Sequence, residues 1–116
     1  MENNEILESI ITSCENIKAE NIVALNMKKI TPVADYFVIC EASNEKQVQA
    51  IARAIQKDLE AINIPIARVE GFNEGRWILV DTNDVICHIF HSEERGYYNL
   101  ERLWGDAQEV NLSSLN

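Results

Sequence analysis

The sequence predicts an α/β domain in which a mixed sheet of about five strands packs with two main helices and a short C-terminal helix. Three observations lead to this fold class. Two stretches carry apolar residues at three- and four-residue steps, as amphipathic helices do. Several short apolar runs are bounded by turn-forming residues, which is typical of strands. One helix lies between two of these strands, an order that favours a crossover between parallel neighbours.

The first half of the chain begins with an amphipathic helix, expected over residues 5–19. Its apolar side chains form one stripe: Ile6, Leu7, Ile10, Ile11, Cys14 and Ile17. A strand is expected over 21–26. Thr31-Pro32 then imposes an extended or turn conformation, and a second strand is expected over 36–40.

The second main helix has the clearest helical pattern in the chain. Ser43 is its expected N-cap, and Glu45 lies in the first turn, where negative charge suits the helix dipole. The helix continues to about Ile62, and Pro65 lies just beyond its end. A third strand is expected over 66–69, as a parallel neighbour of the strand before the helix.

A hairpin follows, with strands over 76–80 and 84–90. Its expected loop is 82–83, so that Asp81 pairs with Asp84. Because strand side chains alternate, this pairing fixes which residues share a face.

One face of the hairpin is purely apolar and is expected under the helices: Ile78, Val80, Val85, Cys87 and Ile89. The other face is apolar but adds an indole N–H and an imidazole, with Trp77 opposite His88: Trp77, Leu79, Ile86, His88 and Phe90. Two interpretations of this second face stay open. It is a docking surface for a partner, which amphipathic aromatic side chains suit, or it is a core face covered by the C-terminal helix.

The C-terminal helix is expected to place four large side chains on one stripe: Tyr97, Leu100, Leu103 and Trp104. Gly105 is a natural helix stop. The composition fits an interface hot spot and the core of a small domain equally well. The expected organisation is one domain over 1–105 with a flexible tail over 106–116.

Composition and charge restrict the function. The net charge of −9 makes direct nucleic-acid binding unfavourable, because such binding depends on Lys and Arg neutralising phosphates. An acidic domain suits a basic protein partner, although acidity also serves solubility alone. No apolar run reaches the ~20 residues of a membrane span, and the acidic N-terminus is unlike a signal peptide. These features favour the cytoplasm.

Motifs for catalysis, metals and cofactors are absent from the sequence. It contains no GxGxxG, P-loop, nucleophile elbow or HExxH. Asp81 and Asp84 fit turn formation better than a catalytic pair. The three cysteines, Cys14, Cys40 and Cys87, have no CxxC spacing and apolar surroundings, so we expect buried, reduced thiols. The residues therefore favour a protein that is not an enzyme and binds no metal or cofactor.

Two blocks resemble the ribosomal silencing factor family (RsfS, also called Iojap or YbeB). They are ADYFVICEASNEKQVQAIA at 34–52 and VEGFNEGRWILVDTNDVICHIFHSEERGYYNLERLW at 69–104. The second block is the more specific. Ten of its positions match the family's signature in register: Trp77, Asp81, Asp84, His88, Phe90, Arg95, Tyr97 or Tyr98, Leu100, Glu101 and Trp104. Asn83 stands where the family usually has glycine, and Asn tolerates the same left-handed backbone.

The resemblance implies a translation repressor without enzymatic activity. It implies binding to the large ribosomal subunit through ribosomal protein L-fourteen, obstruction of small-subunit joining under nutrient limitation, and a homodimer when free. It also implies a nucleotidyltransferase-like fold, although the glycine-serine and paired-aspartate signature of those enzymes is absent. The partner-binding residues implied are Trp77, Asp81, Asp84, His88, Phe90, Arg95, Tyr97, Tyr98, Glu101 and Trp104. The alternatives are a nucleotide-binding relic and a dimeric adaptor in large-subunit assembly.

Overall fold

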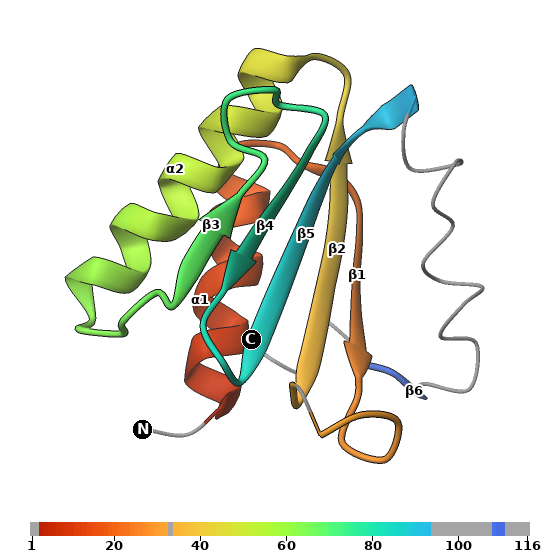
Figure 1. Ribbon diagram of the computed structural model, residues 1–116, viewed down its shortest axis with the longest axis vertical. Helices are drawn as coiled ribbons and strands as arrows, with labels where there is room; N and C mark the ends of the chain where they lie inside the picture. Colours follow the sequence, from red (N-terminus) through yellow and green to blue (C-terminus); the bar gives the residue numbers. More distant parts are fainter. Residues whose placement is uncertain (1–2, 33, 94–107, 111–116) are drawn as a thin grey trace.

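The computed structural model describes residues 3–32, 34–93 and 108–110. Two helices, α1 (Asn3–Asn16) and α2 (Glu45–Ala61), pack on one face of a six-stranded sheet with the order β3-β4-β5-β2-β1-β6 (Figure 1). The strands are β1 Glu20–Asn26, β2 Tyr36–Ala42, β3 Arg68–Glu70, β4 Trp77–Asp81, β5 Val85–His91 and β6 Gln108–Glu109. β2 and β5 pair in parallel and the other pairs are antiparallel. The predicted mixed α/β architecture is confirmed.

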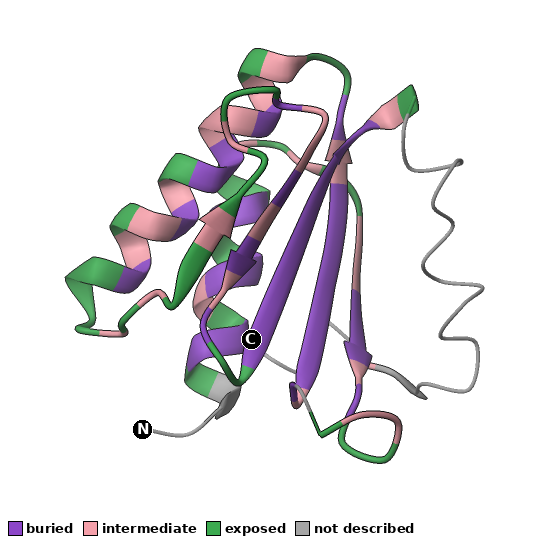
Figure 2. Cartoon of the chain, viewed as in Figure 1, coloured by how far each residue is buried: buried purple, intermediate pink, exposed green. Residues whose placement is uncertain are grey.

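β2 and β5 form the centre of the sheet because both are apolar on both faces. Every residue of β5 is buried, and in β2 only Glu41 is partly exposed (Figure 2). The prediction that the strand after α2 lies beside β2 is wrong, since β4 and β5 lie between β2 and β3. The short β3, with Arg68 and Glu70 exposed, suits the edge, where charge discourages pairing with other chains.

α2 begins one residue later than predicted. Asn44, rather than Ser43, is the N-cap: its backbone is extended and its Oδ1 accepts a hydrogen bond from the Gln47 N–H at 2.8 Å. The helix ends at Ala61, and Asn63 adopts a positive φ of 61°. Such a left-handed residue after a helix turns the chain back toward the sheet.

The hairpin pairing differs from the prediction by two residues. Val80 pairs with Cys87, and Trp77 pairs with Phe90 rather than with His88. The turn is closed by Thr82, whose N–H donates to the Val85 carbonyl at 3.0 Å and whose hydroxyl donates to the same oxygen at 2.7 Å.

Asp81 therefore pairs with Ile86 and not with Asp84. Asn83, with φ of 75°, occupies the left-handed position of the turn. Because the shift is an even number of residues, each side chain stays on its predicted face.

Two hydrophobic clusters lie on opposite sides of the sheet. The first joins α1 and α2 to one sheet face and contains the predicted Ile78, Val80, Val85, Cys87 and Ile89. The second contains Leu25, Met27, Ala34, Phe37, Ile39, Ile86 and Phe90, with Trp77 and Leu79 packed against it. The predicted division of the hairpin into two faces is confirmed.

The end of the chain is described only in part. Gln108–Glu109, within the segment expected to be flexible, pairs as β6 with Leu25 and Asn26 of β1, and Val110 N donates to the Ala24 carbonyl at 2.7 Å. The predicted helix carrying Tyr97 and Trp104 lies outside the described residues. No helix in the described part of the chain is both long and apolar enough to span a membrane.

Candidate functional site

The candidate site is the sheet face opposite α1 and α2, which we call the aromatic face. It is built from alternate residues of three adjacent strands, so each of its side chains follows from strand geometry. Its members are Trp77 and Leu79 on β4, Ile86, His88 and Phe90 on β5, and Phe37 and Ile39 on β2.

The aromatic rings form a row across these strands. Trp77 stacks on Phe90, its cross-strand partner, with ring centroids 5.1 Å apart and an interplanar angle of 26°. Phe37 meets His88 edge-on at 5.0 Å. Aromatic pairs of this kind contribute about 0.5–1.5 kcal/mol each beyond area burial. The row therefore stiffens the face as well as filling it.

Trp77 and His88 are joined by a hydrogen bond. The Trp77 Nε1–H donates to His88 Nδ1 at 3.1 Å. Because Nδ1 accepts, the proton of the neutral imidazole is assigned to Nε2. His88 is only 6% exposed, and its Nε2 finds no hydrogen-bond partner within the structure described. The face thus carries one buried N–H group that has donating capacity to spare.

Burial also sets the charge of this ring. Desolvation penalises the imidazolium and lowers the pKa of His88 to about 4. The ring is therefore neutral at pH 7. An apolar face that carries no charge at pH 7 suits an apolar side chain of a protein partner.

The two candidate carboxylates lie at the far end of the hairpin and build its turn. Asp81 accepts from Arg68 Nε at 3.2 Å and from the Asn83 N–H at 2.7 Å. Asp84 is exposed, and its backbone carbonyl accepts from the Asp35 N–H at 2.7 Å. At ~3.3 Å per residue, β4 separates this turn from Trp77 by roughly 13 Å. The structure does not bring the carboxylates into the aromatic row.

A family model described as "Ribosomal silencing factor during starvation" matches residues 1–116. The chain belongs to the ribosomal silencing factor family. The resemblance inferred from the two sequence blocks is therefore confirmed over the whole chain.

Individual relatives agree with this assignment. The ribosomal silencing factor RsfS of Halalkalibacterium halodurans is 49% identical over 115 residues, covering 99% of this chain and 98% of its own length. That of Bacillus subtilis is 49% identical over 112 residues, covering 97% and 95%. A crystal structure of a Bacillus halodurans protein matches with a TM-score of 0.85 at 46% identity, covering 94% of this chain and 99% of its own.

Some residues of the candidate site were not predicted from the sequence, and some predicted residues lie outside the described part of the chain. Phe37 and Ile39 belong to the aromatic face but were not among the predicted site residues. The alternation within YFVIC carries the signal, since it separates these two from Tyr36, Val38 and Cys40. Five predicted residues lie outside the described part of the chain: Arg95, Tyr97, Tyr98, Glu101 and Trp104.

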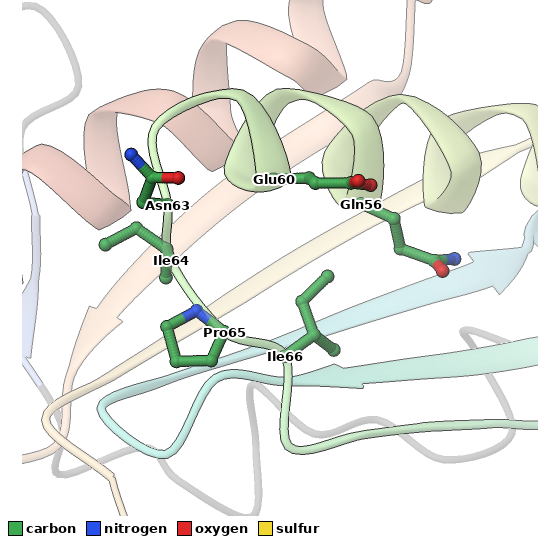
Figure 3. A pocket seen from close by; sticks show the side chains of 6 residues that line it. All are labelled: Gln56, Glu60, Asn63, Ile64, Pro65 and Ile66. Atoms are coloured by element: carbon green, nitrogen blue, oxygen red, sulfur yellow. The ribbon is translucent and has the colours of Figure 1, made fainter.

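A concave region lies where α2 ends, away from the residues of the aromatic face. A hollow of about 600 Å³ is lined by Gln56, Glu60, Asn63, Ile64, Pro65 and Ile66 (Figure 3). Among the described residues that line it, Glu60 is the one charged residue and none is basic. Phosphate recognition depends on cations or clustered N–H donors. The described lining of the hollow therefore gives no support to nucleotide binding.

Proposed function

We propose that this ribosomal silencing factor represses translation when nutrients are limiting. It binds the large ribosomal subunit through ribosomal protein L-fourteen and thereby blocks joining of the small subunit. The observation that carries the proposal is the family match over residues 1–116, and the aromatic face supplies the docking chemistry. The role is regulatory rather than catalytic, and it places the protein in the cytoplasm.

The aromatic face has the composition of a protein-docking surface. Trp77 and Leu79 are partly exposed beside the buried Phe90 and Ile86. Trp is among the residues most enriched at binding hot spots, which combine a buried apolar anchor with a few polar contacts. We assign Trp77, which is partly exposed, as the anchor, and His88 as the buried residue that orients its indole through the Nε1–H hydrogen bond.

The charge of the chain favours a protein partner over RNA. At −9 it is repelled by exposed phosphates but attracted by a basic ribosomal protein. A protein-mediated contact resolves how an acidic domain can bind an RNA-rich particle. Once bound, a small protein obstructs a much larger interface simply by occupying one contact surface.

Two other functions receive less support. Nucleotide binding by a nucleotidyltransferase relic would need free carboxylates for a metal, but Asp81 already holds Arg68 and the turn. A dimeric adaptor would use the same aromatic face for a second copy. We retain a homodimer of the free protein as part of the proposal, competing with ribosome binding where both use this face.

Sedimentation with purified subunits tests the proposal. The protein should travel with large subunits in a sucrose gradient and, in excess, reduce the yield of joined ribosomes. Calorimetric titration with isolated L-fourteen should give a single binding event. A protein that stays at the top of the gradient in the presence of large subunits contradicts ribosome binding, and sedimentation without calorimetric binding contradicts only the assigned partner.

Trp77→Phe provides a matched variant for this test. It keeps a ring on Phe90 but removes the N–H that binds His88, leaving buried Nδ1 without its donor. We expect weaker large-subunit binding and a stability loss of about 1–3 kcal/mol, the usual cost of an unsatisfied buried polar group. The control is Thr12→Ala on α1, an exposed and uncharged residue on the other side of the sheet, which should leave binding unchanged. If Trp77→Phe and the unmodified protein bind large subunits equally well, the Trp77 N–H does not contribute to docking.

A further inference from the structure

Three cysteines from three different elements meet inside the first hydrophobic cluster. Cys14 comes from α1, Cys40 from β2 and Cys87 from β5. Their Sγ atoms all lie within 4.8 Å of one another, and the Cys14 and Cys40 sulfurs are 3.8 Å apart. All three side chains are completely buried, as free thiols. We call this group the thiol triad.

The size of the triad matches the coordination of one ion. Thiolate sulfurs bind soft ions at about 2.3 Å, so three sulfurs around one ion are about 4 Å apart in a plane and about 3.5 Å apart in a pyramid, the geometry of an ion with a lone pair. The 3.8 Å separation of Cys14 and Cys40 is close to the pyramidal value, and the longest side needs a contraction of up to about 1.3 Å by side-chain rotation. Soft thiolate ligands select soft ions.

The surroundings of the triad decide which charge the ion must carry. The neighbouring side chains are aliphatic residues of α1, α2 and the sheet. All three thiols are fully buried among apolar side chains, where a net charge on the sulfurs would have no partner.

A bound ion should leave the triad uncharged as well, because an unpaired buried charge is costly. Zinc with three thiolates would leave a net negative charge. It would also lack a fourth ligand, since the described residues offer only these three donors at the site. A trivalent ion held by three thiolates is neutral.

We propose that the thiol triad is a binding site for a soft trivalent ion of the arsenic(III) or antimony(III) class. In the binding step, neutral arsenous acid reacts with the three thiols. Three As–S bonds form, three As–O bonds and three S–H bonds break, and three waters leave. No oxidation state changes, and the cluster begins and ends without net charge.

Occupancy would tie the N-terminal helix to the centre of the sheet. Cys14 lies near the end of α1, whereas Cys40 and Cys87 lie on the paired central strands. The ion can enter only when the end of α1 opens locally, so binding should be slow. Only the folded chain holds all three thiols together, so binding should raise the melting temperature.

Mass spectrometry of the full, reduced chain with sodium arsenite counts the thiols directly. A phosphine reductant is used so that no added thiol competes. A three-thiol adduct has lost one more water than a two-thiol adduct, and the two masses are resolved. We expect one ion per chain with the three-thiol mass. A two-thiol mass, no adduct, or a melting temperature lowered by arsenite overturns the proposal.

Substitutions locate the site. Cys14→Ala, Cys40→Ala and Cys87→Ala should each weaken arsenite binding at least about tenfold and abolish the rise in melting temperature. Ile10→Val is the matched control, since it loosens packing in the same cluster while retaining every thiol. Affinity unchanged by all three cysteine substitutions, or tighter binding of Zn²⁺ than of arsenite, overturns the assignment. If a cysteine variant does not fold, the mass of the arsenite adduct of the unsubstituted chain still tests the proposal.

Discussion

At the residue scale, His88 concentrates the chemistry of the aromatic face. It accepts a hydrogen bond from Trp77 and meets Phe37 edge-on, and its buried Nε2–H has no hydrogen-bond partner among the described residues. Its sequence neighbour Cys87 points to the opposite side of the sheet, into the thiol triad. Because strand side chains alternate, the imidazole of one residue lies on the aromatic face and the thiol of the preceding residue lies in the core on the other side of the sheet.

The buried imidazole makes stability depend on pH. Its pKa is about 4 in the folded protein and near 6.5 when unfolded. As the pH falls through this window the unfolded state binds more protons, so the free energy of unfolding decreases. Linkage gives a loss of about 2 kcal/mol between pH 7 and pH 5 from this group. Urea unfolding at both pH values measures it, and His88→Phe should lose correspondingly less. Equal losses in the two proteins would contradict the assignment.

The faces of individual residues were predictable from the sequence, whereas their exact partners were not. Ile78 and Trp77 fall on their predicted faces because strand side chains alternate, and a shift of the pairing by two residues leaves each side chain on the same face of the sheet. The shift itself arises from Thr82, whose hydroxyl closes the turn at Val85. Sequence patterns do not reveal such a side-chain contact, because aspartate, threonine and asparagine are all common in turns.

At the element scale, α2 shows how a helix start is decided by backbone geometry. Ser43 and Asn44 are adjacent, and both residue types are good N-caps. Only Asn44 places its side chain on the Gln47 N–H. The extent of the helix was predictable from its apolar spacing, but the choice between two adequate caps was not.

Separate substitutions of Asn44 and Ser43 test which of the two residues caps α2. Asn44→Ala should lower the free energy of unfolding by about 1 kcal/mol through loss of the cap. Ser43→Ala should change it by less than about 0.5 kcal/mol, as exposed positions usually do. Denaturant titration of both variants against the unmodified chain provides the measurement. A larger loss for Ser43→Ala than for Asn44→Ala would place the cap at the predicted residue instead.

At the scale of the whole molecule, the strand order was the least predictable feature. Rules for neighbouring elements placed β3 beside β2, but the β4–β5 hairpin separates them. The deciding factor is how much of each strand must be buried: β5 is apolar on both faces and takes the centre, while β3 is charged and takes the edge. Burial pattern was thus a better guide to order than sequence adjacency.

The thiol triad belongs to the same scale. Its members are separated widely in sequence and share no spacing motif, so only the pairing of β2 with β5 and the docking of α1 bring them together. The sequence predicted that each thiol is buried but not that the three meet.

The net charge leads to a prediction for ribosome binding. If a basic protein attracts this chain of charge −9, the association rate with large subunits should fall steeply as ionic strength rises from about 0.05 to 0.5 M. The dissociation rate should change much less, because it depends on the apolar contacts. Stopped-flow mixing of labelled protein with large subunits gives both rates. An association rate independent of salt would remove electrostatic attraction from the proposal.

The parallel pairing of β2 with β5 also determines when the chain can fold. Tyr36 pairs with Val85, so about 50 residues separate the partners at the centre of the sheet. β1 and α1, although made first, have no complete sheet to pack on until β5 has left the ribosome. The apolar stripe of α1 has its complete packing surface only once the residues through 91 are present, and such long-range pairing favours late formation of the core.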